Sequence, residues 1–274
     1  MKLSDAIKIL SEAGIDSARH DAKAIFSELG GISQASLMIG DAECGSESVS
    51  RAVMMRAERI PLQYILGKCA FYREEYFVNE NCLIPRADTE ILVDFAVRHI
   101  PECESFVDLC TGSGCVGISV LKNTVGTRGT LVDISDGALL LAKKNAEHNG
   151  VLERADIMRL DVMREVPDGS FYAVLSNPPY VAESVYGELE REIFFEPKMA
   201  FVGGADGGDF YRHLTPIYKE KIKKGGFIAY EIGYDQADML RGIAEECGMS
   251  CEIIRDLSGN DRVAVLRYKQ SLLD

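Results

Sequence analysis

From residue 91 onward, short apolar runs alternate with amphipathic stretches of helical spacing, and this alternation constrains the fold more than any other feature. Apolar strands that alternate with helices form a mostly parallel sheet with helices on both faces. We therefore predict an α/β fold with seven strands. The last two are joined by a link too short for a parallel crossover, so they should pair antiparallel. The strands are predicted at 106–110, 130–133, 157–160, 171–176, 226–232, 251–257 and 262–268.

The first part of the chain shows helical spacing alone. Apolar residues recur at positions 3, 7 and 10, then at 18, 22, 25 and 29, and again at 49, 53, 57 and 60. We predict a small helical bundle over residues 1–72, a hairpin linker over 73–90 and the α/β domain over 91–274. Nothing in the bundle suggests catalytic chemistry. It is either a cap packed on the larger domain or a docking surface for a macromolecular partner.

Charge, cysteine and histidine usage exclude several classes of protein. The chain carries 30 basic and 43 acidic residues, a formal net charge of -13. This balance disfavours direct binding to nucleic acid or to an anionic membrane surface. Eight cysteines occur without a C-x-x-C pair, and the four histidines lie far apart. We therefore expect no metal site and reduced thiols, as is usual for a cytoplasmic protein. No apolar run is long enough for a membrane span or a signal peptide.

A glycine-rich turn follows the first strand of the predicted sheet and opens a helix. Gly112, Gly114 and Gly117 match G-x-G-x-x-G, a pattern that lets a ligand approach the main chain closely. Asp133 ends the next strand, 21 residues after Gly112, where an acidic side chain can bind ribose hydroxyls. Dinucleotides and S-adenosylmethionine both carry such a ribose. These features alone leave an NAD-dependent dehydrogenase and a methyltransferase open.

The second candidate motif, Asn177-Pro178-Pro179-Tyr180, follows the fourth strand. In open parallel sheets, ligands bind at the carboxyl edge of the strands. Consecutive prolines make a rigid loop whose carbonyls remain free to accept hydrogen bonds, and Asn177 can accept through its side-chain oxygen. Tyr180 offers a ring face. The motif therefore predicts a pocket for a planar amide or amine.

These two motifs together resemble those of class I methyltransferases that methylate amino nitrogens, which include adenine-N6 DNA methyltransferases and protein glutamine methyltransferases. From about residue 61 to 268, the chain further resembles the HemK/PrmC family of peptide chain release factor glutamine methyltransferases. The segments that carry this resemblance are Pro61–Gly67, Leu83–Arg86, Phe195–Pro197, Gly203–Gly207, Phe210–Arg212, Glu231–Gly233 and Asp256–Arg262.

The resemblance implies a Rossmann-like class I methyltransferase domain preceded by a substrate-docking bundle. It further implies methyl transfer from S-adenosylmethionine to the amide nitrogen N5 of the glutamine in the Gly-Gly-Gln motif of class 1 release factors. The product would be S-adenosylhomocysteine, and the modification would modulate translation termination. We expect a cytoplasmic monomer that uses no metal. An adenine-N6 DNA methyltransferase remains the main alternative, and a non-catalytic module that binds the cofactor or a partner is a further one.

The resemblance also implies roles for the residues at matching positions of this sequence. The catalytic and substrate-binding residues implied are Asn177, Pro178, Pro179 and Tyr180. The cofactor-binding residues implied are Cys110, Thr111, Gly112, Ser113, Gly114, Asp133, Asp161, Val162 and Asn177.

Two of these positions depart from the family pattern. Val162 stands where the family often has an aromatic residue, so it offers the adenine only an aliphatic wall. Cys110 stands where glycine is common. Because a positive φ would strain a cysteine, we predict an ordinary backbone angle there. No histidine is close in sequence, so we expect a buried thiol at Cys110 rather than a nucleophile.

Overall fold

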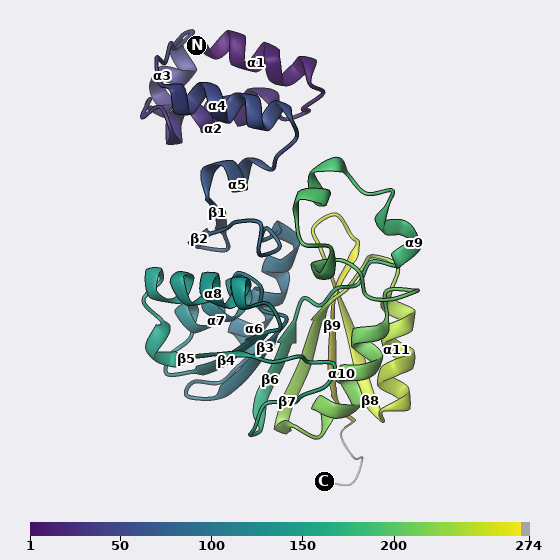
Figure 1. Ribbon diagram of the computed structural model, residues 1–274. Helices are drawn as coiled ribbons and strands as arrows, with labels where there is room; N and C mark the ends of the chain where they lie inside the picture. Colours follow the sequence, from purple (N-terminus) through teal and green to yellow (C-terminus); the bar gives the residue numbers. More distant parts are fainter. Residues whose placement is uncertain (270–274) are drawn as a thin grey trace. The chain divides into compact units, whose positions relative to one another are not determined.

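The computed structural model describes residues 1–269; residues 270–274, the end of the domain predicted over 91–274, lie outside the described part. The chain divides into two compact units, which Figure 1 shows. One unit comprises Met1–Cys69 together with Glu190–Phe195. The other comprises Ala70–Leu189 and the chain from Glu196 onward. A short segment from late in the sequence therefore belongs to the N-terminal unit, and sequence periodicity gave no sign of it.

The N-terminal unit is helical, as predicted. The apolar positions at helical spacing turn inward, and Leu10, Ile25 and Val53 are fully buried in its core. Burying each such aliphatic side chain contributes about 1.5–3 kcal/mol to the free energy of folding relative to exposure. These buried residues therefore hold the short helices together. The helices are α1 (Leu3–Glu12), α2 (Ala18–Glu28), α3 (Gln34–Ile39), α4 (Glu47–Ala57) and α5 (Leu62–Leu66).

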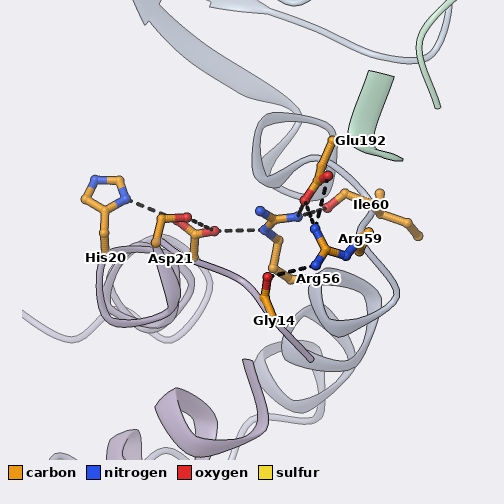
Figure 2. Close-up of polar contacts among 8 residues, drawn as sticks. Gly14, His20, Asp21, Arg56, Arg59, Ile60 and Glu192 are labelled. Carbon is orange, nitrogen blue, oxygen red and sulfur yellow. Dashed lines mark hydrogen bonds and ion pairs between the residues drawn. The ribbon is translucent and has the colours of Figure 1, made fainter. Parts of the chain in front are cut away.

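A cluster of ion pairs lies within this unit (Figure 2). Arg56 of α4 has a side chain that is only 9% exposed, and its Nε donates to Asp21 Oδ2 of α2 over 2.8 Å. Its Nη1 donates to Glu192 Oε1 over 3.2 Å, and Arg59 Nη1 reaches the same oxygen over 3.2 Å. Arg59 Nη2 also donates to the Gly14 carbonyl over 2.7 Å. Two guanidinium groups thus balance two carboxylates and fasten the segment 190–195 to the helices.

The second unit is built on a seven-stranded sheet with the order β5-β4-β3-β6-β7-β9-β8. The pairs from β5 to β7 are parallel, whereas β9 runs antiparallel to both β7 and β8. The predicted fold class and the antiparallel pairing of the last two strands are confirmed. The strands are β3 (Ser105–Leu109), β4 (Arg128–Asp133), β5 (Ala155–Arg159), β6 (Phe171–Ser176), β7 (Ile222–Glu231), β8 (Met249–Arg255) and β9 (Asp261–Tyr268).

Helices cover both faces of this sheet, as its apolar strands require (Figure 1). Helices α10 and α11 pack on one face, where Leu214 and Leu240 join Val107, Val132 and Ile228 of the strands in one core cluster. Helices α6, α7 and α8 pack against one another on the other side of the sheet. The helices are α6 (Glu90–His99), α7 (Cys115–Asn123), α8 (Asp136–His148), α9 (Glu183–Tyr186), α10 (Asp209–Lys219) and α11 (Ala237–Glu246). A hairpin does precede them, but its first strand, β1 (Lys68–Phe71), lies before the linker predicted over 73–90, and only β2 (Glu74–Phe77) falls within it.

The strand order determines where the site can form. From β3 the chain continues outward through β4 and β5, and it then returns to place β6 on the opposite side of β3. Because these strands are parallel, their carboxyl ends share one edge, and the reversal of order opens a crevice there. Residues at or just after the ends of β3, β4, β5 and β6 meet at this edge, including Cys110, Asp133, Asp161 and Asn177.

Candidate active site

The glycine-rich turn between β3 and α7 forms the floor of the site. Gly112 and Gly114 adopt positive φ values of 56° and 82°, which glycine reaches without strain. A Cβ at Gly114 would also come within 2.6 Å of Ile118 Cδ1 and 3.2 Å of Ala142 Cβ, so glycine here allows the turn to pack closely on α7 and α8. Thr111 N donates to Val132 O over 3.0 Å, and the Ser113 carbonyl accepts from Asn145 Nδ2 over 2.8 Å. The turn is therefore fixed on both sides.

Asp108 lies beneath this turn, a residue for which the sequence analysis proposed no role. Its carboxylate accepts from Thr111 Oγ1 over 2.5 Å and from Gly117 N over 2.9 Å. The side chain is buried, and burial raises the pKa of Asp108 to about 7 while these hydrogen bonds partly offset the rise. The sequence did contain a sign of this role, since Asp108 is a carboxylate within an otherwise apolar strand. Acidic side chains stay buried only where they are hydrogen-bonded. Its role is to hold the turn.

Cys110 corrects one prediction. Its φ is +58°, not the ordinary angle expected from the sequence. The chain must reverse direction directly after β3, and three of the five residues from Cys110 to Gly114 have positive φ to achieve this. The neighbouring contacts, including Ser176 Oγ to Leu109 O at 2.6 Å, hold the strained residue in place. Cys110 is half-buried rather than buried and lines the cavity described below, so the expected burial is not complete. Desolvation nevertheless raises the pKa of its thiol well above the usual value, which disfavours a nucleophilic thiolate.

We expect Cys110→Val to lower the free energy of unfolding by about 2 kcal/mol, because a β-branched side chain is more strained than cysteine in the left-handed region. Urea unfolding of the full chain measures the change. Cys251→Val is the matched control, since Cys251 lies on the extended strand β8, where valine is favoured. Equal stability of the two variants would show that Cys110 carries no backbone strain.

Asp133 ends β4 and presents its carboxylate to the crevice. Oδ2 accepts from Gly112 N over 2.8 Å, and Oδ1 accepts from Ser135 N over 2.9 Å. Each oxygen therefore uses one backbone donor and keeps capacity for a second. Burial raises the pKa of Asp133, and the backbone hydrogen bonds partly offset this. The arrangement suits a pair of neighbouring hydroxyl groups.

A cavity of about 520 Å³ opens at this edge of the sheet. Seven of the sequence-predicted site residues line it: Cys110, Gly112, Asp133, Asp161, Val162, Asn177 and Pro179. Thr111, Ser113, Gly114, Pro178 and Tyr180 are not among its lining residues. Its walls also include residues for which sequence reasoning assigned no place: Glu80–Leu83, Pro197, Met199, Ala200, Val202 and Phe210.

The side chain of Glu196 connects two of the wall segments that the sequence had not assigned to the cavity. It is 5% exposed, and its Oε2 accepts from Ile84 N over 2.8 Å while its Oε1 pairs with the Arg86 guanidinium. Burial raises the pKa of Glu196, and Arg86 partly offsets the rise. The segment before Ile84 and the segment after Glu196 are thereby tied together around the cavity. The quoted sequence segments at 83–86 and 195–197 contained both partners, but only the fold shows that they pair.

Asn177 lies at the cavity wall in a defined orientation. Its Nδ2 donates to Thr89 Oγ1 over 3.2 Å. Its Oδ1 makes no hydrogen bond within residues 1–269, and neither does the Pro178 carbonyl. Two strong acceptors are therefore left free on one short, rigid loop. A planar group with two N–H donors complements such a pair.

Close packing and hydrogen bonds fix the part of the loop that contains Pro179 and Tyr180. Gly203 packs directly on it, since a Cβ there would come within 2.3 Å of the Pro179 carbonyl oxygen. The Tyr180 carbonyl accepts from Gln236 Nε2 over 2.9 Å. The Tyr180 hydroxyl donates to Glu231 Oε1 over 3.2 Å and so points into the protein. Packing of its ring on a substrate side chain stays a prediction.

Among residues 1–269, no group of three His, Cys, Asp or Glu side chains is arranged to hold a metal ion. Nor does any helix in that range have the length and apolar character needed to cross a membrane.

Comparison with known proteins adds independent information. The family described as "Methyltransferase small domain" matches residues 87–202, and the "PrmC N-terminal domain" family matches residues 2–67. A protein named release factor glutamine methyltransferase from Geobacter sulfurreducens is 34% identical, over 93% of this chain and 91% of that protein. One of the same name from Caulobacter vibrioides is 34% identical over 96% and 93%.

Solved structures show the same fold at low sequence identity. The ribosomal protein L11 methylase of Lactobacillus delbrueckii subsp. bulgaricus superposes with a TM-score of 0.52 at 17% identity, covering 70% of this chain and 84% of that one. A methyltransferase from Pyrococcus furiosus gives a TM-score of 0.51 at 18% identity, covering 70% and 86%.

Proposed function

Since the chain belongs to the release factor glutamine methyltransferase family, we propose that it transfers a methyl group from S-adenosylmethionine to a release factor glutamine. The acceptor is the side-chain amide nitrogen, N5, of the glutamine in the Gly-Gly-Gln motif. Two acceptors without a hydrogen-bond partner in residues 1–269 support the proposal: Oδ1 of Asn177, which lines the cavity together with Asp133, and the carbonyl of Pro178, the next residue in the chain.

The residues around the cavity fit S-adenosylmethionine, which supplies an electrophilic methyl group on a sulfonium centre when bound. Asp133 has acceptor capacity for the ribose hydroxyls, and the backbone from Cys110 to Gly114 would surround the methionine part. Asp161 and Val162 line the cavity beyond β5, where they would flank the adenine. Asp161 Oδ1 is held by Met163 N over 3.1 Å, so this wall is also ordered.

The chain's contribution to the chemistry is orientation. An amide nitrogen is a poor nucleophile, because its lone pair is delocalised into the carbonyl. Asn177 Oδ1 and the Pro178 carbonyl would accept the two N–H groups of the glutamine and direct the lone pair at the methyl group. Such positioning can lower a barrier by roughly 7–11 kcal/mol. The same acceptors stabilise positive charge that develops on the nitrogen.

The remaining roles follow from this arrangement. Tyr180 would pack on the glutamine side chain. A proton can leave to water after transfer, so we assign no general base and no covalent intermediate. We further propose that the helical bundle predicted over residues 1–72 docks the release factor. The enzyme would act as a cytoplasmic monomer that binds neither nucleic acid nor membrane and modulates translation termination.

The test of the proposed function is methyl transfer in solution. Incubation with labelled S-adenosylmethionine and a class 1 release factor should label the factor, and mass spectrometry should place one methyl group on the glutamine of its Gly-Gly-Gln motif. A Gln→Ala change in that motif should abolish the label. Persistent labelling of the Gln→Ala factor contradicts the assigned acceptor, and methylation of duplex DNA in preference to protein contradicts the substrate class.

Asp133→Asn should weaken S-adenosylmethionine binding by about 10- to 100-fold, since hydrogen bonds to a charged group contribute about 1.5–3 kcal/mol. Isothermal titration of the purified protein measures the dissociation constant. Asp136→Asn is the matched control, because Asp136 is nearby on α8 but its side chain is 79% exposed. If both variants bind like the wild type, Asp133 does not hold the ribose.

A further inference from the structure

Gln236 is a buried side chain that the proposed chemistry does not use. It follows the turn after β7, directly before α11, and is 6% exposed. Its Nε2 donates to the Tyr180 carbonyl over 2.9 Å, and its Oε1 accepts from Gly233 N over 2.9 Å. The Tyr211 hydroxyl lies 3.3 Å from the same Oε1. One carboxamide therefore joins the loop that carries Asn177 to the end of the central sheet.

The partners of Gln236 leave its amide a single orientation. A backbone N–H can only donate, and a carbonyl can only accept. Gly233 N therefore requires Oε1, and Nε2 is directed at Tyr180. The main chain of Gln236 is fixed as well, since its N donates to the Gly233 carbonyl over 3.0 Å and its carbonyl accepts from Leu240 N over 3.1 Å. The donor offered to Tyr180 thus has a defined place.

The loop from Asn177 to Tyr180 needs donors from outside itself. Pro178 and Pro179 have no backbone N–H, so two consecutive residues cannot donate a hydrogen bond to fix the loop. Proline also restricts φ to about −65°, which leaves little rotational freedom between Asn177 and Tyr180. A shift of the Tyr180 carbonyl is therefore passed on to the Pro178 carbonyl, one of the two proposed acceptors.

Other contacts of this loop lead to a second loop. Val181 N donates to the Phe201 carbonyl over 2.7 Å, and the Val181 carbonyl accepts from Gly203 N over 3.0 Å. Gln236 differs because it connects the loop backbone to the residues that end β7 and begin α11.

A glycine leaves room for the Gln236 hydrogen bond. A Cβ at Gly207 would lie 2.1 Å from the Tyr180 carbonyl oxygen and 2.8 Å from Gln236 Nε2. The segment Gly203–Gly207 carried part of the family resemblance without an assigned role. In the structure it packs on the loop and keeps open the space in which the amide meets the carbonyl.

We infer that Gln236 is a positioning residue for methyl transfer, which acts through the Tyr180 carbonyl to hold the Pro178 carbonyl and Asn177 in place. The inference rests on the proposed function, because it concerns the acceptors that would bind the glutamine amide. Gln236 is not among the residues that line the cavity, so it should affect turnover and not the binding of S-adenosylmethionine.

The test is release factor methylation by full-length variants at saturating S-adenosylmethionine. Gln236→Met keeps the length of the side chain and removes the amide; we expect kcat to fall about 10- to 100-fold, since a displacement of about 1 Å can cost this much. The KM for the release factor and the dissociation constant for S-adenosylmethionine should each stay within about threefold, the pattern of an interaction that matters in the transition state. Rates are expressed per bound S-adenosylmethionine, so that molecules that do not fold are not counted.

Tyr211→Phe is the matched control for Gln236→Met. Tyr211 is fully buried in the same cluster, and its hydroxyl also contacts Gln236, but its removal leaves the amide that donates to Tyr180 and the Gly233 contact that orients it. It should keep kcat within about threefold, the loss of one ordinary hydrogen bond away from the loop.

A second pair of variants disturbs the same hydrogen bond from the other side. Gly207→Ala places a methyl group against the Tyr180 carbonyl and should lower kcat about tenfold or more, again with little change in S-adenosylmethionine binding. Gly204→Ala is its matched control: both glycines have positive φ, 78° at Gly207 and 95° at Gly204, but a Cβ at Gly204 would meet the Asp209 side chain and not the loop. It should lower kcat less than about threefold.

A double-mutant cycle checks that Gln236 acts through the acceptors. In an Asn177→Ala background one of the two acceptors is already missing, so Gln236→Met should lower kcat by less than about threefold further. An independent loss of structure would give the same factor in both backgrounds.

The outcomes distinguish the inference from the proposed function. If the wild type methylates the release factor and Gln236→Met does so with the same kcat, the inference is wrong and the proposed function stands. The inference is also wrong if either control lowers kcat as much as the variant it matches, or if Gln236→Met has the same effect with and without Asn177. A wild-type enzyme that labels no release factor contradicts the proposed function and the inference together.

Discussion

Replacing Asn177 with alanine is expected to lower kcat for release factor methylation by about 100- to 1,000-fold. Removing one preorganised group that stabilises charge in a transition state typically costs this much. The structure gives the reason for assigning the effect to this residue: Asn177 lines the cavity, its Oδ1 has no hydrogen-bond partner in the described chain, and its Nδ2 donates to Thr89. Steady-state labelling at saturating S-adenosylmethionine measures kcat.

The binding of S-adenosylmethionine provides the internal control for this variant. Asp133 and the glycine turn remain intact in Asn177→Ala, so the dissociation constant should change by less than about threefold. Asn177→Asp gives a second readout, because an aspartate keeps the acceptor but cannot donate to Thr89. We expect it to recover little of the lost turnover. Unchanged turnover in Asn177→Ala would remove the central support for an acceptor-lined amide site.

Replacing Arg56 with methionine should lower the stability of the helical unit by about 3–5 kcal/mol. The guanidinium compensates Asp21 at 2.8 Å and Glu192 at 3.2 Å, and Asp21 is 3% exposed (Figure 2). Removing one partner of a buried ion pair leaves an uncompensated buried charge, which is the costly case. Hydrogen exchange of the α2 and α4 amides in the full-length protein reports the opening free energy of this unit.

Two further variants check the cause. Arg51→Met removes an exposed arginine of the same helix, whose pair with Glu47 is solvated, and should cost less than about 0.5 kcal/mol. The double variant Asp21→Asn with Arg56→Met removes both charges and should recover part of the loss. If Arg56→Met is no more destabilising than Arg51→Met, the buried cluster does not hold the helical unit together.

The sequence predicted the architecture well because the relevant signals are local. Apolar runs such as 106–110 and 171–176 are long enough for strands, and a linker as short as 258–261 permits only an antiparallel pair. These features gave the sheet and its last pairing correctly. They also placed Asp133 and Asn177 at strand ends, and parallel strands bring such residues to one edge. The family resemblance narrowed the reaction, which local patterns had left open.

The walls of the cavity and the hydrogen bond between Asn177 and Thr89 could not be predicted from local patterns. Glu80–Leu83 and Met199 are distant in sequence from the glycine turn, and nothing periodic connects them to it. Thr89 ends η1 (Ala87–Thr89) and Asn177 follows β6, 88 residues later in the chain, so only the fold brings the two side chains within hydrogen-bond distance.

The sequence by itself determined which segments become strands and helices, and which chemical groups stand at the strand ends. It did so because hydrophobic spacing and turn chemistry act over a few residues. The tertiary structure alone decided the positive φ of Cys110, the burial of Asp108 and Glu231, and the inclusion of Glu190–Phe195 in the helical unit. Backbone strain, the burial of a charge and the partner of a hydrogen bond all depend on atoms that come together only when distant segments pack.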